Sequence, residues 1–200
     1  MGKHFHRQNA GFTMIEVAIV VTISVIVAAM AIPVFSSMAR NLRGDGELQS
    51  LRSAVVQAKT RSAATFSRAR LRVNTSARTF QLELWNKTSS TWNVEGAVES
   101  LPSGVNFGFG SISAPPPNTQ ASIAQAAACK DGAGTTIANT ACIIFNSRGI
   151  PVDSTGTALL TGDAIYINDS ASALSVTVGR TGLIRGWRRD LTGSSTWGGR

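Results

Sequence analysis

An uninterrupted apolar run near the amino terminus constrains the fold of this chain more than any other feature. The run extends from Phe12 to Ile32 and contains a single carboxylate, Glu16. At about 1.5 Å per helical residue it would cover roughly 31 Å, about the thickness of one hydrocarbon core. The sequence therefore predicts a transmembrane helix over residues 12–33. A carboxylate inside such a helix is costly unless it is neutralised, so Glu16 implies a partner charge.

A short polar segment precedes the apolar run. Residues 1–10 contain Lys3 and Arg7 together with both histidines of the chain, and the small residue Gly11 follows directly. An ordinary secretory signal would place its cleavage site after the apolar run. The closest candidate there is the Ala-Ala-Met-Ala-Ile-Pro stretch at residues 28–33, which gives only a weak alternative. The small residue lies before the run instead.

The Gly-Phe-Thr-Met-Ile-Glu stretch at residues 11–16 resembles the class III leader of type IV pilins and type II secretion pseudopilins. Pro33 lies where the helices of that family commonly carry a proline. The resemblance implies that residues 1–11 are a leader, which a membrane prepilin peptidase removes by cutting after Gly11. It further implies N-methylation of the new terminus at Phe12 and a role in filament assembly for Glu16.

Elementary electrostatics supports such an assembly role. After cleavage Phe12 would carry a cationic amine, and Glu16 lies about 6 Å further along the helix axis. In a stack of staggered subunits, Glu16 of one subunit could meet the Phe12 amine of the next, which would remove both unpaired charges. The alternative is that Glu16 reaches the headgroups and stabilises the amino terminus of its own helix. Both can hold, the alternative in the free subunit and the pairing in the filament.

Charge alone does not orient the chain in a membrane. Lys3 and Arg7 precede the apolar run while Arg40 and Arg43 follow it, so the positive-inside comparison is nearly tied. The resemblance to prepilin leaders implies a cytoplasmic amino terminus in the bacterial inner membrane and a periplasmic main domain. The net charge of +8 is compatible with nucleic acid or anionic membrane as a partner, and equally with solubility alone.

The rest of the chain predicts an α+β fold. Leu48, Leu51, Val55 and Ala58 recur at helical spacing, so residues 34–66 are expected to continue the first helix as an amphipathic helix, with a bend or local melting at Gly44 and Gly46. From about Ala69 the pattern changes to period two, so residues 67–200 are expected to form a β-rich domain with an antiparallel sheet packed on that helix.

Individual elements of this β-rich domain follow from alternation and turn residues. We expect a hairpin of strands near 69–73 and 80–84 joined by a turn at Asn74–Arg78, and shorter strands at 92–94 and 105–107. The proline-containing segment 111–120 predicts a loop, and the alanine-rich segment 121–128 predicts a short helical turn. Later strands are expected at 141–146, 164–168, 173–178 and 183–187.

Two cysteines lie in the predicted periplasmic domain. Cys129 and Cys142 flank a short segment rich in glycine and threonine, and a disulfide between them would contribute about 3 kcal/mol through loop entropy. Two free thiols are the alternative. A metal site is not expected, because both histidines lie in the leader and four ligands cannot be gathered.

The stretch from Cys142 to Pro151 points to one group within the pilin-like family. A strand ending in Phe145, then a polar-Gly-x-Pro turn, and a later glycine-rich closing strand are similar to the GspH/FimT group of minor pseudopilins. This resemblance implies a structural subunit of a type II secretion pseudopilus or of a type IV pilus tip, with other pilins or pseudopilins as its filament partners. A single-pass anchored protein without filament assembly is a further alternative.

The carboxy-terminal region contains candidate DNA-binding residues, namely Arg180, Arg185, Arg188 and Arg189. FimT-like proteins are implicated in DNA capture through a Gly-Arg-x-Arg signature, and Gly182-Leu183-Ile184-Arg185 has leucine in place of the first arginine. The alternative is that Arg185 points outward from the last strand and that Arg188 and Arg189 form a solvated tail.

A second basic stretch contains Arg61, Arg68, Arg70, Arg72 and Arg78, some of which are expected to face solvent or neighbouring subunits. The mature part has no histidine and no Gly-x-Ser-x-Gly motif, so we expect neither an enzyme nor a cofactor.

Overall fold

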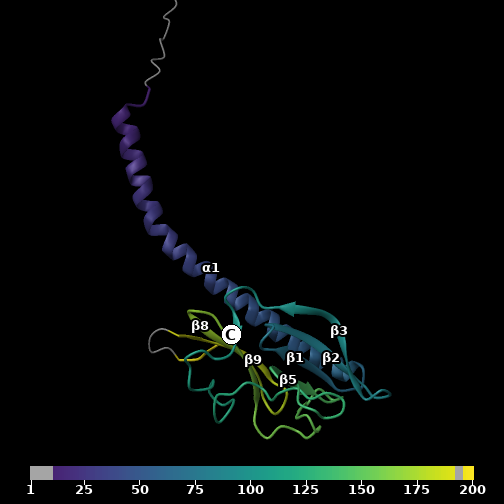
Figure 1. Cartoon of the computed structure of the whole chain (residues 1–200). Coiled ribbons are helices and arrows are strands. Elements are labelled where there is room, and N and C mark those ends of the chain that lie inside the picture. The colour runs from purple at the N-terminus through teal and green to yellow at the C-terminus, as the bar shows by residue number, and fades with distance from the viewer. Residues whose placement is uncertain (1–10, 192–195) are drawn as a thin grey trace, which may run out of the picture. The chain divides into compact units, whose positions relative to one another are not determined.

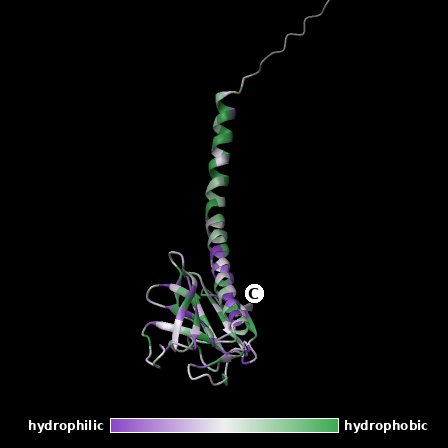
Figure 2. Ribbon diagram, turned by 90° about the vertical axis from the view of Figure 1, so that its right-hand side faces the viewer, coloured by the Kyte–Doolittle hydropathy of each residue, from purple (hydrophilic) through white to green (hydrophobic). Residues whose placement is uncertain are grey.

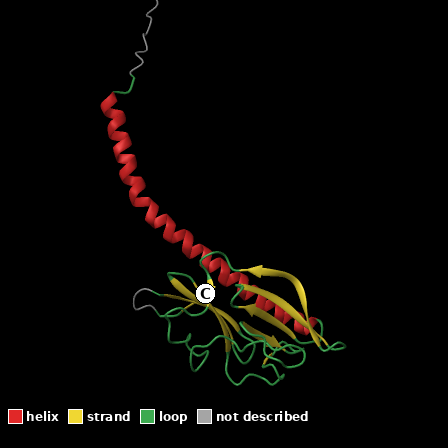
Figure 3. Cartoon of the chain, in the orientation of Figure 1, coloured by secondary structure: helices red, strands yellow, loops and turns green. Residues whose placement is uncertain are grey.

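The computed structural model describes residues 11–191 and 196–200 and divides the chain into two compact units, one ending at Arg43 and the other covering Gly44–Arg200. A single helix, α1 (Met14–Ala64), contributes to both units (Figures 1 and 3). Residues 1–10 of the predicted leader lie outside the described residues. The predicted α+β class is confirmed.

The first unit is the apolar part of α1. Every residue from Met14 to Ile32 is exposed, and this segment is long and apolar enough to cross a membrane by length and composition. Figure 2 shows hydrophobic residues over most of this part of the helix. A helix that is apolar all round and buries nothing within its own chain requires an apolar surrounding.

Helix α1 has identifiable signals at both ends. Thr13 caps the amino terminus, because its Oγ1 accepts a hydrogen bond from the Glu16 amide at 3.3 Å. At the carboxy terminus Phe66 adopts a φ of 48°, and the Ser67 amide donates to the Ser62 carbonyl at 3.2 Å. Such a left-handed residue with a back-bonded amide satisfies carbonyls that the helix would otherwise leave free.

The predicted melting at Gly44 and Gly46 is wrong, because both residues lie within the unbroken helix. Gly44 is buried, and a Cβ added there would lie only 3.3 Å from Leu174 Cδ1. The glycine thus allows a close approach to the domain core, where tertiary packing outweighs its weak helix propensity.

Two antiparallel sheets form the rest of the second unit. The first, sheet A, has the order β3-β2-β1-β5-β6, and the second, sheet B, has the order β10-β9-β8-β7-β4. Sheet A contains β1 (Ala69–Asn74), β2 (Thr79–Asn86), β3 (Thr91–Ser100), β5 (Thr140–Phe145) and β6 (Pro151–Val152). Sheet B contains β4 (Asn106–Phe107), β7 (Asp163–Asn168), β8 (Ser172–Val178), β9 (Ile184–Asp190) and β10 (Gly198–Gly199).

The carboxy-terminal part of α1 supplies one wall of the main core. Leu48, Leu51 and Val55 are at most 1% exposed and belong to one cluster with apolar residues of both sheets. Figure 1 shows this part of the helix running along β1 and β2. The helical periodicity read from the sequence therefore identifies the buried face of α1 correctly.

A second, smaller cluster lies on the other face of sheet A. It contains Cys129, Cys142, Ile144 and Val152, with Trp92 and Ile137 packed against it. Because side chains alternate along a strand, Ile144 and Cys142 point away from the α1 side, whereas Ile143 of the same strand belongs to the main core. Sheet A is thus covered on both faces.

Most strand predictions are confirmed to within one to three residues at their ends, except that β3 is longer than expected. The turn at Asn74–Arg78 and the loop at 111–120 are also confirmed. The predicted helical turn at 121–128 is wrong. There the Ala126 amide donates to the Ala164 carbonyl of sheet B, and the Ala127 carbonyl accepts from the Cys142 amide of sheet A. The segment therefore runs between the edges of both sheets, which supply stronger partners than an isolated helical turn would.

Candidate functional site

The predicted processing and assembly residues lie together at the start of α1. Gly11 and Phe12 precede the helix, and the Phe12 side chain is 83% exposed. Glu16 lies in the first helical turn and is exposed. A peptide bond ahead of a helix, in an exposed segment, is accessible to a peptidase. No other described residue covers Glu16, so its carboxylate is available to a partner.

Glu16 also completes a helix-start pattern. Thr13 and Glu16 have the Thr-x-x-Glu spacing of a capping box, and the Thr13 carbonyl accepts hydrogen bonds from the amides of Glu16 and Val17 at 3.1 and 3.2 Å. A carboxylate in the first turn is favoured by the positive end of the helix dipole. This stabilises Glu16 in the free subunit, as the alternative interpretation of this residue requires, and leaves the carboxylate oxygens exposed.

The four carboxy-terminal arginines do not form one cluster. Arg180 lies in the turn between β8 and β9, and the others lie on β9. Side chains alternate along a strand, so Arg185 and Arg189 share one face with Trp187 whereas Arg188 points to the other. Trp187 Nε1 donates to Thr177 Oγ1 at 2.8 Å, which fixes the ring on that outer face.

Arg188 is turned toward α1. Its side chain is 10% exposed, and its Nη1 lies 3.2 Å from Asp45 Oδ1 on α1. Its Nε lies 3.4 Å from Asp190 Oδ1. The suggestion that Arg188 belongs to a solvated tail is therefore wrong, since it ties β9 to the helix. DNA binding by Arg180, Arg185 and Arg189 stays a prediction, which a gel-shift titration of variants at these positions would test.

The sequence interpretation missed a buried charge network on the outer face of sheet A. Arg70 is 1% exposed, and its Nη2 and Nε lie 2.5 and 2.6 Å from Glu83 Oε2. The other oxygen of Glu83 accepts hydrogen bonds from Arg72 Nη1 at 3.1 Å and from Gln81 Nε2 at 2.6 Å. Burial lowers the pKa of Arg70 from its ordinary value, while the adjacent Glu83 acts in the opposite direction.

The strand register explains how these charges meet. Arg70 on β1 pairs directly with Glu83 on β2. Arginines at alternate positions 68, 70 and 72 place their side chains on one face, opposite the face that carries Leu71 and Val73. The sequence predicts that some of these arginines face solvent or neighbouring subunits, because Glu83 and the loop at residues 130–134, which covers this face, are remote from them in sequence.

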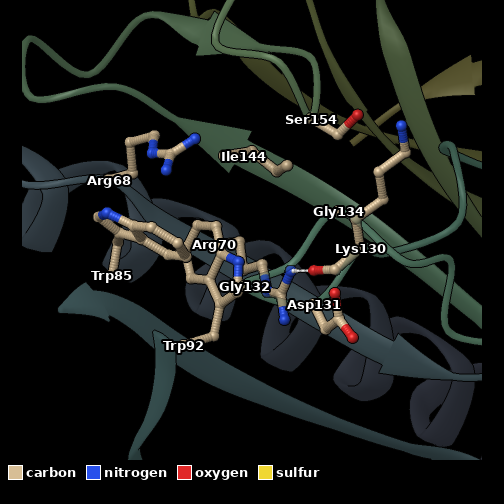
Figure 4. Close-up of a pocket in the computed structure, with 10 residues that line it drawn as sticks. All are labelled: Arg68, Arg70, Trp85, Trp92, Lys130, Asp131, Gly132, Gly134, Ile144 and Ser154. Carbon is tan, nitrogen blue, oxygen red and sulfur yellow. Dashed lines mark hydrogen bonds between the residues drawn. The ribbon is translucent and has the colours of Figure 1, made fainter. Parts of the chain in front are cut away.

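Two tryptophans join this network (Figure 4). The rings of Trp85 and Trp92 meet edge to face with centroids 5.1 Å apart. The Arg68 guanidinium carbon lies 4.4 Å from the Trp85 centroid, and that of Arg70 lies 4.0 Å from the Trp92 centroid. Cation–π contacts of this kind restrict the position of a guanidinium group over a ring.

A disulfide joins the covering loop to sheet A. Cys129 and Cys142 are bonded, with their Cα atoms 5.1 Å apart. The Cys129 amide donates to Thr140 Oγ1 at 3.0 Å, and the Lys130 carbonyl accepts from Arg70 Nη1 at 2.6 Å. The bridge therefore anchors the start of the loop over Arg70 to β5.

Comparison with known proteins supports the interpretation of the amino terminus. A model of the prokaryotic N-terminal methylation motif matches residues 6–32, which include the predicted cleavage position after Gly11, as well as Phe12 and Glu16. No curated protein matches the chain. Among solved structures, the chain is similar to the minor pseudopilin EpsH from the type 2 secretion system of Vibrio cholerae, at 12% identity and a TM-score of 0.45, covering 71% of this chain and 94% of that chain. The motif concerns the first unit alone.

Proposed function

We propose that this protein is a pilin-like minor pseudopilin, a structural subunit of a type II secretion pseudopilus or a type IV pilus tip. The observation that carries the proposal is the N-terminal methylation motif on an exposed apolar helix with one acidic residue, Glu16. That helix continues into a disulfide-bonded α+β domain. A filament subunit needs both parts, a helix that packs with its neighbours and a folded domain outside the membrane. The role is structural and not catalytic.

Maturation converts the membrane-inserted precursor into an assembly-competent subunit. A prepilin peptidase cuts after Gly11 and leaves Phe12 as an N-methylated terminus. The mature helix anchors the protein in the inner membrane by a single pass, with the carboxy-terminal domain in the periplasm. The periplasm is oxidising, which suits the Cys129–Cys142 bridge.

Glu16 drives incorporation because it makes no ion pair with any described residue of the free subunit and gains one in the filament. A carboxylate costs about 3 kcal/mol at the centre of a membrane helix and less near the helix end, where Glu16 lies, and this cost falls when the carboxylate meets a cation. The methylated Phe12 amine of an adjacent subunit supplies that cation, and each subunit offers both partners. Extraction of the helix from lipid into the filament then exchanges one apolar surrounding for another while the charges become paired.

The test compares variants of Glu16 for membrane insertion and filament incorporation in the native host. Glu16→Gln should insert at the wild-type level but appear in the sheared filament fraction at least tenfold less often, since it keeps the shape of the side chain and removes its charge. Glu16→Asp should restore part of the incorporation. Glu47→Gln is the matched control, because it removes a carboxylate from α1 outside the apolar segment. Incorporation of Glu16→Gln at the wild-type level, or an equal loss in Glu47→Gln, would contradict the pairing.

A further inference from the structure

The outer face of sheet A carries more cations than its own carboxylates can neutralise. Arg68, Arg70 and Arg72 follow one another at alternate positions, and a single carboxylate, Glu83, serves the last two. Among the residues that the structure describes, Arg68 makes no ion pair. This row of arginines therefore ends in the Arg68 guanidinium group, which is held in place but has no carboxylate partner among the described residues.

Aromatic contacts orient that guanidinium group. Its central carbon lies 4.4 Å from the Trp85 centroid and 5.6 Å from the Trp92 centroid. These contacts restrict the position of the guanidinium group, and its N–H groups suit a planar, two-oxygen acceptor. Because the orientation is set before any ligand arrives, binding would cost little side-chain entropy.

Arg68 borders a pocket of about 100 Å³ between the sheet and the covering loop. Figure 4 shows Arg68 at one end and Lys130 at the other, with Ile144 and Ser154 between them. The Lys130 side chain makes no ion pair among the described residues, while its carbonyl is fixed by Arg70. Asp131 also lines the pocket, but its Oδ1 accepts the amides of Ala133 and Thr135 at 3.0 and 2.8 Å.

The loop itself is held close to the sheet. A Cβ added to Gly132 would lie 2.0 Å from the Ser90 carbonyl oxygen in the β2–β3 turn, so only glycine fits there. The disulfide at Cys129 fixes the start of the same loop. Both constraints keep the pocket preformed, which favours recognition over a merely basic surface.

We propose that this pocket binds a carboxylate from an acidic segment of a partner protein, with Arg68 as the main anchor and Lys130 as the second cation. An arginine on the same face of the sheet already binds a carboxylate, since Arg70 contacts Glu83 through Nε and Nη2. The partner is a different protein rather than a second copy, because this chain has 19 Lys and Arg against 11 Asp and Glu, and two copies repel each other.

The tryptophan rings at this site already contact arginine side chains, which distinguishes the site from one that binds nucleic acid. Binding of single strands relies on bases that stack on free aromatic faces. Here Arg68 already stacks on Trp85, and Arg68 and Arg70 both contact Trp92. The tryptophans therefore orient cations for an acidic side chain and are not platforms for bases. The proposal does not depend on how the amino terminus is processed.

The test measures peptide binding to the mature full-length chain in nanodiscs of zwitterionic lipid. The probe is a fluorescein-labelled peptide of alternating glutamate and serine, and its glutamine counterpart is the control ligand. Affinities are read by fluorescence anisotropy at about 0.15 M salt, where diffuse attraction between exposed charges is largely screened. Inorganic phosphate and a single-stranded oligonucleotide serve as competitors.

Arg68→Gln should weaken binding of the glutamate peptide by about tenfold or more, the value of a charge-assisted hydrogen-bond pair. Arg68→Lys should lose less, since it keeps the charge but not the two-pronged donor. Lys130→Gln is a second pocket variant with a smaller expected loss of about threefold. Arg185→Gln is the matched control, because it removes one exposed cation from β9 of sheet B.

Four outcomes would overturn the proposal. These are no binding of the glutamate peptide, equal binding of the glutamine peptide, equal losses in Arg68→Gln and Arg185→Gln, or displacement by phosphate or oligonucleotide at lower concentration than by unlabelled glutamate peptide. Retention of the cooperative unfolding transition in each variant shows that a loss of binding is not a loss of fold.

Discussion

Glu83→Gln tests whether the buried charge network holds the outer face of sheet A together. The substitution keeps the size and shape of the side chain but removes the negative charge that Arg70 and Arg72 share. Glutamine can still accept hydrogen bonds through one oxygen. Its amide group, however, would face a guanidinium donor, and the Arg70 cation would stay buried without a counter-ion.

The loss of stability expected for Glu83→Gln depends on how deeply the ion pair is buried. A second ion pair in the chain provides the comparison. Arg70–Glu83 and Arg61–Glu95 both have a closest N–O distance of 2.5 Å. The first pair is 2% and 3% exposed, whereas the second is 52% and 26% exposed. Removing one partner of a buried pair costs about 3–5 kcal/mol, while an exposed pair contributes less than about 1 kcal/mol. The two pairs have equal N–O distances, but removing the charge of Glu83 should therefore destabilise the fold more than removing the charge of Glu95.

The assay is thermal unfolding of the mature full-length chain in detergent, followed by near-ultraviolet circular dichroism, which reports the packing of Trp85 and Trp92. At about 2–4 °C per kcal/mol for a domain of this size, Glu83→Gln should lower the melting temperature by about 6–20 °C. Glu95→Gln makes the same chemical change in the more exposed pair and should lower it by less than about 4 °C. A Glu83→Gln shift as small as that of Glu95→Gln would refute the reasoning.

The remaining predictions concern the disulfide, a buried acid and the β9–α1 contact. Replacing both Cys129 and Cys142 by serine should lower the free energy of unfolding by about 3 kcal/mol, measured by urea denaturation, and wild-type protein in reductant should show the same loss. Burial raises the pKa of Asp163 to about 6, so the folded state favours the protonated acid and stability should fall as pH rises through that value. Asp163→Asn should therefore melt at a higher temperature than wild type at pH 7, with the difference vanishing below about pH 4, and a pH-independent difference would contradict this. Arg188→Gln should cost about 1–2 kcal/mol, whereas Arg185→Gln on the exposed face should be neutral, and equal costs would show that Arg188 is not anchored.

The elements that the sequence predicted well are those with a strong period. The apolar run identified the start of the long helix, while the helical spacing of Leu48, Leu51 and Val55 and the alternation around Leu71 and Val73 identified both the element and its buried face. In each case local pattern and tertiary packing agree, since the residues that repeat are the residues that enter the core.

The failures occur where a distant segment decides the local structure. Residues 121–128 are rich in alanine, which favours helix, yet Ala126 and Ala127 bond to strands of two different sheets. Its partners Ala164 and Cys142 lie outside the segment in sequence, so no local window contains this information. Gly44 likewise stays helical because it approaches Leu174, a contact between residues far apart in the chain.

The charge network of sheet A was missed for a related reason. Arginines are rarely buried, so alternation of Arg68, Arg70 and Arg72 predicts a solvent face. Burial of Arg70 requires Glu83 opposite it and the disulfide-anchored loop above it. Strand register and disulfide pairing together would have indicated this arrangement, but the sequence supplied each of them only as a separate expectation.

The central claim is that the apolar helix enters a filament through its processed terminus. Mass spectrometry of the amino-terminal peptide, from protein isolated from the membranes of the native host, tests this claim most directly. The account predicts a chain that begins at Phe12 with a methylated amine. A chain that retains Met1, or one cut after the apolar run near residue 31, would contradict it.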